Sequence, residues 1–553
     1  MEEDTPVTLP SPANRTPQSE GRLPRIGRTA TANTAVAAAL AAIIAFAGPP
    51  GADLAAHVFQ RDLFLEHGFA LWTNYWYAGR YTFVGYSLLY YPLAAFLGIA
   101  LLAVLSVALA TWAFTVLAEG LWGRAAVLPS RLFAIVAAAS VITAAFPYGL
   151  GLALALCALV AVARGRLTLF SVLAVLTFGA SPLAFLFLLI VLGAVALSRS
   201  EFDFAKPAAV LGVVCLFGAL LWRLFPDGGR FPFSTPELLA VMVFCLLGLA
   251  LTWGVDKARI LTFVFAAYAA ACLLAYAVPS SLGENVVRLR FIAIPIAALT
   301  LSLRRWQPLP VAIAAFGLAL SWNATPLAFS FVRSSQDPSA SAAYWSPAVS
   351  WLSTRLTPSY RVEAVDTSGH WEAVYLAKAN IPIVRGWFRQ DDFPQNEVLY
   401  DPMGRKAYLD WLHQMGVRYV VLTDAPTDYS AADEASLLRS GRSRLPVVFR
   451  SAHLTIYRVP GARPIIAGPG NPSVTAIGDS NLTLLVRQPG RYRLALRFTP
   501  YLTATDACLS ETAAGMTIVH ARRAGLIDLD FNLSASGALA AISGSHTHCS
   551  EPG

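Results

Sequence analysis

Long apolar runs separated by short turns occupy the chain from about residue 34 to residue 325. A helix that crosses a bilayer needs about 20 largely apolar residues, and sometimes only about 17. On this measure the pattern predicts about eleven membrane helices, of which the fourth to sixth are short and closely spaced. Their centres lie near residues 41, 107, 139, 157, 174, 190, 216, 245, 268, 296 and 316.

Composition and charge agree with this class. Hydrophobic residues make up 56% of the 553-residue chain and charged residues only 13%, against about 25% charged residues in soluble domains. The chain is therefore predicted to be an α-helical polytopic membrane protein with an attached soluble part. Its formal charge of +8 does not indicate a nucleic-acid partner, because the basic residues of the apolar region are scattered at predicted helix ends.

The basic residues also predict an orientation. When the predicted helices are threaded up and down in turn, the Arg and Lys residues of the tail and of alternate turns fall on one side, which the positive-inside rule assigns to the cytoplasm. The N-terminus is then expected inside a plasma or inner membrane, and the chain after about residue 326 outside it. The residues are Arg22, Arg25, Arg28, Arg124, Arg131, Arg164, Arg166, Arg199, Lys206, Lys257, Arg259, Arg304 and Arg305.

The N-terminal region divides at about residue 33. Residues 1–33 contain too few apolar residues to fold alone and are predicted to be a disordered cytoplasmic tail. The apolar run at 34–48 also fits the core of a signal peptide. An amphipathic, Trp-containing segment and further membrane helices follow it, which favours an uncleaved first span of a membrane domain over 34–325.

Two soluble units are predicted after the last membrane helix. In residues 340–462, KAYLDWLHQMG is typical of an amphipathic helix that ends at Gly416, and VRYVVLTD and HLTIYRV are typical of strands, which indicates an extracytoplasmic α/β domain. Residues 470–553 alternate at period two with turn residues between the runs, as in LTLLVRQPGRYRLALRF. This pattern predicts an antiparallel β-sandwich, a module that supports or binds more often than it catalyses.

The six cysteines fall into two groups. Cys508 and Cys549 are the only pair in the C-terminal region, and an extracytoplasmic compartment would oxidise them to a disulfide. A metal site is less favoured there, because no CxxC or HxxxH spacing accompanies them. The others lie in apolar runs, where a Cys acts as a small hydrophobic residue; they are Cys157, Cys215, Cys245 and Cys272.

The first loop, Gly51 to Ser87, is the one long polar interruption among the apolar runs. Irregular polar backbone is tolerated only outside the hydrocarbon or where it lines a protein cavity. Asp53, His57 and Arg61 recur every four residues, so an interfacial helix would present all three on one face. This spacing indicates that the loop forms a functional surface and does not merely connect two helices.

Aromatic residues crowd the second half of this loop. They fit either an ordinary aromatic belt at the membrane interface or a surface that stacks against a sugar and an acceptor. The residues are Trp72, Tyr75, Trp76, Tyr77, Tyr81, Tyr86, Tyr90 and Tyr91, and we take Trp72, Tyr75 and Trp76 as candidate substrate-binding residues.

An outward acidic loop after the first helix, an LLYYP start to the second span and an extracytoplasmic C-terminal region resemble the GT-C superfamily of polyprenyl-phosphate-dependent glycosyltransferases. Four stretches also resemble a group of multi-pass membrane proteins frequent in actinobacteria: GADLAAHVFQ…LWTNYWYAGRY, ENVVRLRFIAIP, HWEAVYLAKANIPIVRGWFRQ and GVRYVVLTDAPTDYSAADEASLLRSG. The second resemblance covers most of the chain after about residue 50. The first rests on loop position and topology.

The GT-C resemblance implies a reaction and one catalytic residue. Asp53 takes the place of the catalytic acid of that superfamily, where it would accept a proton from the acceptor hydroxyl. The donor would be a polyprenyl-phosphate-linked sugar, and the acceptor an envelope glycan or glycolipid. The leaving phosphate needs an outward cation, and the planar donor fork of Arg suits it.

Candidates for binding the donor and acceptor are polar residues expected at the outer side. Arg288 and Arg290 rank first, because outward Arg is the exception in this chain, and Arg61 and Arg80 follow. Arg223 and Arg230 are also outward but have fewer aromatic neighbours. The substrate-binding candidates are therefore His57, Arg61, Arg80, Glu284, Arg288 and Arg290, in addition to the aromatic residues named above.

The chain also departs from the superfamily pattern, and simpler roles stay open. Ala55 stands where many members carry a second acid, so no cofactor is expected, and a divalent metal is possible but not supported by a DxD pair. Asp53 could instead cap the interfacial helix, a position that Asp favours. His57 could be an interfacial side chain with its polar groups satisfied, and Arg288 and Arg290 could reach lipid headgroups.

Two other classes of function remain as alternatives. A transporter or lipid flippase usually has repeated halves and charged or broken helices near the midplane, whereas the spans of this chain carry almost no central charge. The third class is a non-catalytic scaffold that binds envelope glycans. A cavity that converges on Asp53 and Arg288 would favour the transferase, and a midplane cavity would favour transport.

Overall fold

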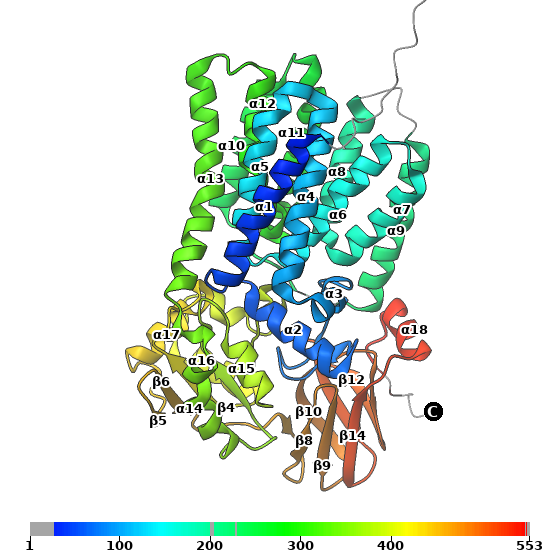
Figure 1. Ribbon diagram of the computed structural model, residues 1–553. Coiled ribbons are helices and arrows are strands. Elements are labelled where there is room, and N and C mark those ends of the chain that lie inside the picture. The colour runs from blue at the N-terminus through cyan, green and yellow to red at the C-terminus, as the bar shows by residue number, and fades with distance from the viewer. Residues whose placement is uncertain (1–26, 199–203, 227–228, 548, 550–553) are drawn as a thin grey trace, which may run out of the picture.

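Among the described residues, eleven apolar helices stand side by side in a bundle, and two smaller units pack against one end of it (Figure 1). The computed structural model describes residues 27–198, 204–226, 229–547 and 549. Large apolar side chains point outward from the bundle, among them Phe46, Leu216 and Phe329. A broad exposed apolar surface of this kind is typical of a lipid-facing protein.

A helix lies at each of the eleven predicted centres. Eight segments among the described residues are long and apolar enough to cross a membrane, and one of them, Ile99–Thr143, is a hairpin that contains α4 and α5. Two more apolar helices, α7 and α8, are shorter. The bundle consists of α1 (Arg28–Ala47), α4 (Ile99–Trp122), α5 (Val127–Ala139), α6 (Phe146–Ala163), α7 (Leu167–Ala180), α8 (Pro182–Ser198), α9 (Ala205–Leu224), α10 (Thr235–Thr252), α11 (Arg259–Ala277), α12 (Ala293–Leu303) and α13 (Leu309–Ser335).

Small residues set the packing of the first helix. Ala30, Ala37 and Ala41 are fully buried on α1, where they meet α4 and α5. Small side chains let two backbones approach closely, which is the usual way in which membrane helices associate. The first helix is therefore an integral part of the bundle.

Two predicted boundaries differ from the structure. Helix α1 begins at Arg28, inside the segment predicted as tail, and residues 1–26 lie outside the described residues. Helix α13 continues through Pro326 to Ser335, beyond the predicted end at residue 325. A proline is tolerated inside a helix where neighbouring groups satisfy the freed carbonyl.

The α/β unit contains a four-stranded sheet in the order β3-β4-β6-β5. Only β3 and β4 pair in parallel. As predicted, a helix ends at Gly416, whose φ of 77° suits a glycine, and leads into a buried strand. The elements are β3 (Arg361–Ala364), β4 (Val417–Thr423), β5 (Val447–Arg450), β6 (Leu454–Arg458), α14 (Ala342–Ser353), α15 (Glu372–Lys378), α16 (Arg405–Met415) and α17 (Ala432–Arg439).

The C-terminal unit is a sandwich of two four-stranded antiparallel sheets, ordered β12-β13-β10-β7 and β11-β14-β9-β8. Alternate residues of both sheets fill one core, including Leu484, Tyr492 and Val519. Helix α18 (Ala535–Ser543) contacts α9. The strands are β7 (Ile466–Ala467), β8 (Ser473–Ile477), β9 (Asn481–Val486), β10 (Gly490–Arg497), β11 (Leu502–Ala504), β12 (Ala507–Glu511), β13 (Met516–Ala521) and β14 (Gly525–Phe531).

The predicted disulfide between Cys508 and Cys549 is present. It ties strand β12 to the end of the chain, 41 residues later. Replacing both cysteines with Ala is expected to lower the free energy of unfolding of the sandwich by about 3–4 kcal/mol, because the open chain gains loop entropy when it unfolds. Chemical denaturation of the full chain measures this, with Cys215→Ala on the exposed face of α9 as the control. Equal stability of the double variant and the wild type would contradict the expectation.

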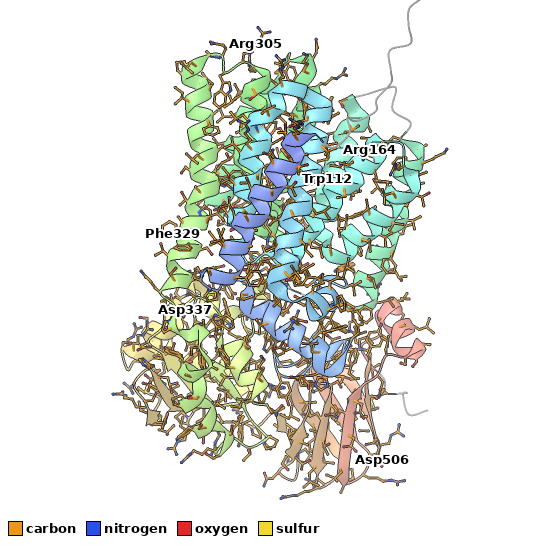
Figure 2. All side chains as sticks on the ribbon, viewed as in Figure 1. Trp112, Arg164, Arg305, Phe329, Asp337 and Asp506 are labelled. Atoms are coloured by element: carbon orange, nitrogen blue, oxygen red, sulfur yellow. A yellow bond between two sulfur atoms is a disulfide. The ribbon has the colours of Figure 1, made fainter. Side chains whose placement is uncertain are left out.

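The first loop lies between the bundle and the two C-terminal units (Figure 1). It contains helix α2 (Leu54–His67), the short hairpin of β1 (Trp72–Thr73) and β2 (Arg80–Tyr81), and helix α3 (Tyr90–Leu97). Figure 2 shows Arg305 at the opposite end of the molecule from Asp506 of the sandwich, while Asp337 lies at the junction. The loop is thus enclosed by protein on both sides.

Candidate functional site

A polar cavity of about 270 Å³ lies where the bundle meets the α/β unit. The segment between α1 and α2 contributes Asp53, and the 3₁₀ segment Gly283–Ile292 before α12 contributes Glu284, Arg288 and Arg290. Arg389 enters from the α/β unit. One carboxylate of the first loop therefore shares a cavity with three guanidinium groups.

Asp53 occupies the residue before α2, but its side chain does not cap that helix within the described residues. The carboxylate instead lies 3.6 Å from the guanidinium of Arg288, and both side chains are 18% exposed. The backbone N–H of Asp53 donates to the carbonyl of Thr143, which fixes the loop against the bundle. The helix-cap alternative does not account for this arrangement.

Burial raises the pKa of Asp53, and the charges of Arg288, His370 and Arg389 only partly offset this effect. The pKa of the neighbouring Tyr86 hydroxyl is shifted by burial and by the charges of the same cavity. Burial and the charge of Asp53 raise the pKa of Tyr86 to about 12, although Arg288 lowers it. A buried carboxylate with a raised pKa beside a cation is typical of functional sites.

His57 does not join Asp53 in the cavity. Its ring is fully buried, with Nδ1 3.3 Å from the hydroxyl of Tyr91, and it packs against Tyr90 and Phe146. Burial lowers the pKa of His57 to about 3, so the imidazole is neutral. His57 is therefore packed inside the protein, as the structural alternative expects, but its Nε2 has no hydrogen-bond partner among the described residues, so its polar groups are not all satisfied.

Arg61 also serves local structure. Its Nε donates to the carbonyl of Ala94 at 3.0 Å, and its guanidinium lies 3.3 Å from Asp62. These contacts join α2 to α3 at a partly exposed site. Arg61 is therefore placed away from the residues that line the cavity.

The three candidate stacking residues are buried, which corrects the expectation that they face a sugar. Trp76 stacks on Phe59 with ring centroids 4.0 Å apart, and its Nε1 donates to the carbonyl of Ala373. Trp72 stacks on Phe531 of the sandwich, and the hydroxyl of Tyr75 hydrogen-bonds Asn380. Their rings join the first loop to both C-terminal units.

Arg80 is likewise a structural residue here. Its Nε lies 2.7 Å from the carboxylate of Asp391, both side chains are at most 2% exposed, and the guanidinium lies 4.0 Å from the centre of the Phe388 ring. A buried pair of this kind needs both partners, because either charge alone would be uncompensated. Arg80 therefore fixes the β1–β2 hairpin to the α/β unit and does not reach the cavity.

Arg290 and Glu284 line the cavity and also hold its wall together. Arg290 lies 3.1 Å from Glu237 of α10, and its own carbonyl accepts from Asn323 of α13. Glu284 accepts from the backbone and hydroxyl of Ser234, the residue before α10. Arg290 is therefore tied to the first turn of α10 and to the middle of α13 rather than extended toward lipid headgroups, and Glu284 is tied to the residue before α10.

The α/β unit adds residues that the sequence did not identify. Arg389 pairs with Asp428 at 2.9 Å, and Asp428 lies 3.7 Å from Nε2 of His370. Burial favours the neutral imidazole, but the surrounding carboxylates outweigh it and raise the pKa of His370 to about 9. The signal in the sequence was the concentration of polar residues in DTSGHWE and RGWFRQDD within apolar surroundings.

No family model and no curated protein matches this chain. A single carboxylate can accept a proton, and the guanidinium groups around it can bind and neutralise a phosphate. Both capacities meet in one cavity at the end of an apolar bundle.

A second cavity, of about 370 Å³, lies between α10, α11, α12 and α13 and opens to the outer surface of the bundle, where Leu239 and Leu318 are exposed. Its wall is almost entirely apolar and includes Leu239, Phe244 and Leu301. Trp322 lines this cavity and points its Nε1 to Glu237 at 3.5 Å, the residue that pairs with Arg290. One chain of contacts thus links the apolar cavity to the polar one.

Proposed function

We propose that the protein is a membrane glycosyltransferase of the GT-C type, which moves a sugar from a polyprenyl-phosphate donor to an envelope glycan or lipid. The observation that carries this proposal is the carboxylate of Asp53 3.6 Å from Arg288 in a cavity with two further Arg residues. In the proposed reaction, Asp53 accepts the proton of the acceptor hydroxyl as this oxygen attacks the anomeric carbon. The bond from that carbon to the phosphate oxygen breaks, and Arg288 neutralises the phosphate that leaves.

The pairing of a polar and an apolar cavity supports an amphiphilic donor. The phosphate and sugar fit the polar cavity, whose volume of about 270 Å³ is at the small end for ligand sites. The prenyl chain fits the apolar cavity, which Trp322 connects to Glu237 and Arg290. A transported polar cargo would need polar groups along its path, and the wall of the apolar cavity offers few.

The proposal includes an orientation, with the N-terminus in the cytoplasm, eleven spans and the C-terminal units outside. A reporter enzyme that is active only in the cytoplasm is expected to be silent when it is fused after Gly553, because Arg and Lys of the turns hold the other end of the bundle inside. The same reporter fused after Arg305 is the control and should be active. Strong activity of the fusion after Gly553 would overturn the orientation and an extracytoplasmic reaction.

Transfer of sugar by purified protein tests the function directly. The full chain is placed in nanodiscs with polyprenyl-phosphate sugars of several kinds and with short envelope glycans or glycolipids, and the product is detected by mass spectrometry. We expect transfer from one donor class that disappears in Asp53→Asn. Movement of intact donor between leaflets without transfer would instead indicate a flippase, and binding of glycans without turnover would indicate a scaffold.

The proposed base also predicts a pH profile. Asp53 acts only when it is unprotonated, so activity is expected to fall as the pH drops through its pKa, which burial raises above the ordinary value of 3.8. The same raised pKa means that the ionised carboxylate disfavours the folded state once the pH exceeds the unfolded value. The measurement is kcat/KM against pH, and an acid limb at or below 3.8 would contradict the assignment.

A further inference from the structure

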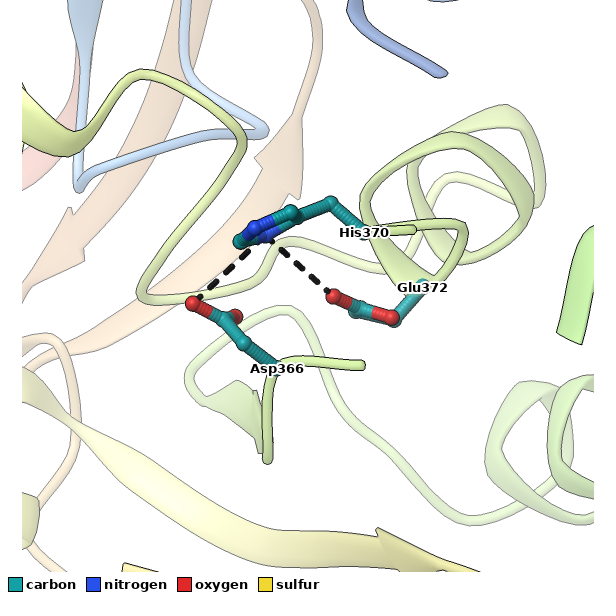
Figure 3. Close-up of side chains that lie close together, drawn as sticks. All are labelled: Asp366, His370 and Glu372. Carbon is teal, nitrogen blue, oxygen red and sulfur yellow. Dashed lines mark ion pairs between the residues drawn. The ribbon is translucent and has the colours of Figure 1, made fainter. Parts of the chain in front are cut away.

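Three side chains of the α/β unit, those of Asp366, His370 and Glu372, bring one potential metal ligand each close together. Asp366 follows β3, Glu372 begins α15, and His370 lies in the turn between them (Figure 3). One ligand atom from each lies within 4.8 Å of the others, and all three residues are buried. The ligand atoms are Oδ2 of Asp366, Nδ1 of His370 and Oε1 of Glu372.

The distances are too long for hydrogen bonds. Nδ1 of His370 lies 3.6 Å from Asp366 and 3.7 Å from Glu372, whereas a charge-assisted N–H to carboxylate bond is about 2.7–2.9 Å long. Nδ1 has no hydrogen-bond partner among the described residues, although His370 is only 7% exposed. A buried polar nitrogen that points at two carboxylates without bonding either requires an explanation.

A divalent cation between the three side chains would explain this arrangement of unbonded polar atoms. Nitrogen and oxygen ligands bind zinc at about 2.0–2.2 Å, so two ligands in a tetrahedral shell stand roughly 3.4 Å apart. The observed 3.6 and 3.7 Å separations are close to this spacing. One imidazole and two carboxylates also form a three-ligand set that leaves a fourth position open, as in many zinc sites.

The surroundings hold the three side chains in place. Nε2 of His370 faces Asp428 at 3.7 Å, and Glu372 accepts from both the backbone and the hydroxyl of Thr367. Nη1 of Arg385 lies 2.8 Å from Oδ2 of Asp366, so a bound metal ion would share this carboxylate oxygen with a guanidinium. A carboxylate that accepts from the far nitrogen is the usual outer support of a metal-binding imidazole, and Asp428 faces that nitrogen here from beyond hydrogen-bond distance.

The backbone at His370 is also unusual. Its φ of 53° lies in the left-handed region, which a non-glycine residue adopts at a cost. Such strain persists where the surrounding structure requires it and is concentrated at functional sites. Here the turn brings Nδ1 between two acids, and Asp428 connects this turn to Arg389 at the wall of the polar cavity.

We infer that Asp366, His370 and Glu372 bind one divalent transition-metal ion, with Zn²⁺ favoured by the ligand set and spacing. The ion would tie the end of β3 to the start of α15 beside the polar cavity. This inference is independent of the proposed glycosyl transfer, because metal content and melting temperature are measured without a substrate.

The test uses the full chain, purified in detergent, stripped with a chelator and then titrated with Zn²⁺. We expect one zinc ion per chain and a melting temperature that rises by roughly 5–10 °C at a hundredfold excess over Kd. His370→Gln and Glu372→Gln should lose both effects. His453→Gln is the matched control, because His453 pairs with Asp424 on the exposed side of the same unit and should keep both.

A second readout protects the test against misfolding of the variants. Co²⁺ added to the stripped wild-type chain should give the visible absorption of a tetrahedral nitrogen and oxygen site. The inference would be overturned if the folded wild-type chain bound no zinc at this cluster and its melting temperature changed with neither zinc nor chelator. The cluster would then be a protonated imidazole among three carboxylates.

Discussion

Asp53→Asn is expected to lower the turnover of sugar transfer by about 10²–10⁴-fold, the usual contribution of a general base. Asn has nearly the same size and still fills the position before α2, but it cannot accept the proton. The loss should appear in kcat more than in KM, because the substrate still binds to the Arg residues of the cavity. Single-turnover transfer in nanodiscs measures the chemical step directly.

The variant should remain folded. Because burial raises the pKa of Asp53, the ionised carboxylate opposes folding at neutral pH, and a neutral Asn is expected to melt no lower than the wild type. Asp62→Asn is the matched control, on helix α2, which Asp53 directly precedes. Asp62 contacts Arg61 and Lys378 at a partly exposed site, where an ion pair contributes only about 0–1 kcal/mol, so that variant should keep full activity.

Near wild-type turnover in Asp53→Asn would reject the base and leave the alternatives of transport and glycan binding. An equal loss in Asp62→Asn would show that α2 responds to any change of charge, and that the effect is not specific to the cavity. A loss in Asp53→Asn alone, with an unchanged melting temperature, is the outcome that supports catalysis.

The apolar helices of the bundle could be predicted from the sequence because lipid strongly restricts which segments can cross a membrane. A segment must be apolar over about 20 residues to cross the hydrocarbon, so each helix of the bundle appeared as a run in the sequence. The same holds for the sandwich, where period-two alternation marked β9 and β10, and for α16, where Gly416 marked the end of the helix. These signals are local, so a single sequence carries them.

The site was only partly open to prediction. Asp53 and Arg288 were identified because each is a polar exception next to an apolar run, and the structure places them 3.6 Å apart. Arg389 and His370 come from a separate folded unit, and nothing local in the sequence connects them to the first loop. Their approach depends on how the α/β unit packs against the bundle.

The aromatic residues were misjudged for a different reason. A Trp that packs against protein and a Trp that stacks on a sugar have the same local sequence, since both need one apolar face and one hydrogen-bond partner. For Trp76 the partners are Phe59 and the carbonyl of Ala373, almost 300 residues away. Arg80 is the same case, because Asp391 could not be paired with it before the fold was known.

Arg288→Gln is expected to lower turnover by about 10²–10³-fold, the typical effect of removing a group that stabilises charge developing in the transition state. The departing phosphate gains negative charge as its bond to the sugar breaks, and Arg288 is the guanidinium nearest to the proposed base. Arg288→Lys should retain part of the activity, because it keeps the positive charge but loses the planar fork that binds a phosphate at two points.

The matched control is Arg230→Gln. Arg230 belongs to a loop at the same end of the bundle, but its exposed side chain pairs with Glu397 and does not line the polar cavity. The Arg230→Gln variant should keep full activity if the effect at Arg288 is local. It should lose as much activity as Arg288→Gln if a general positive potential attracts the donor. Raising the salt concentration separates these cases further, since screening weakens long-range attraction far more than a contact inside the cavity.

A graded order of activity, with Arg288→Lys above Arg288→Gln and no loss in Arg230→Gln, would support Arg288 as the group that receives the phosphate. Full activity in Arg288→Gln would move that role to Arg290 or Arg389, which share the cavity.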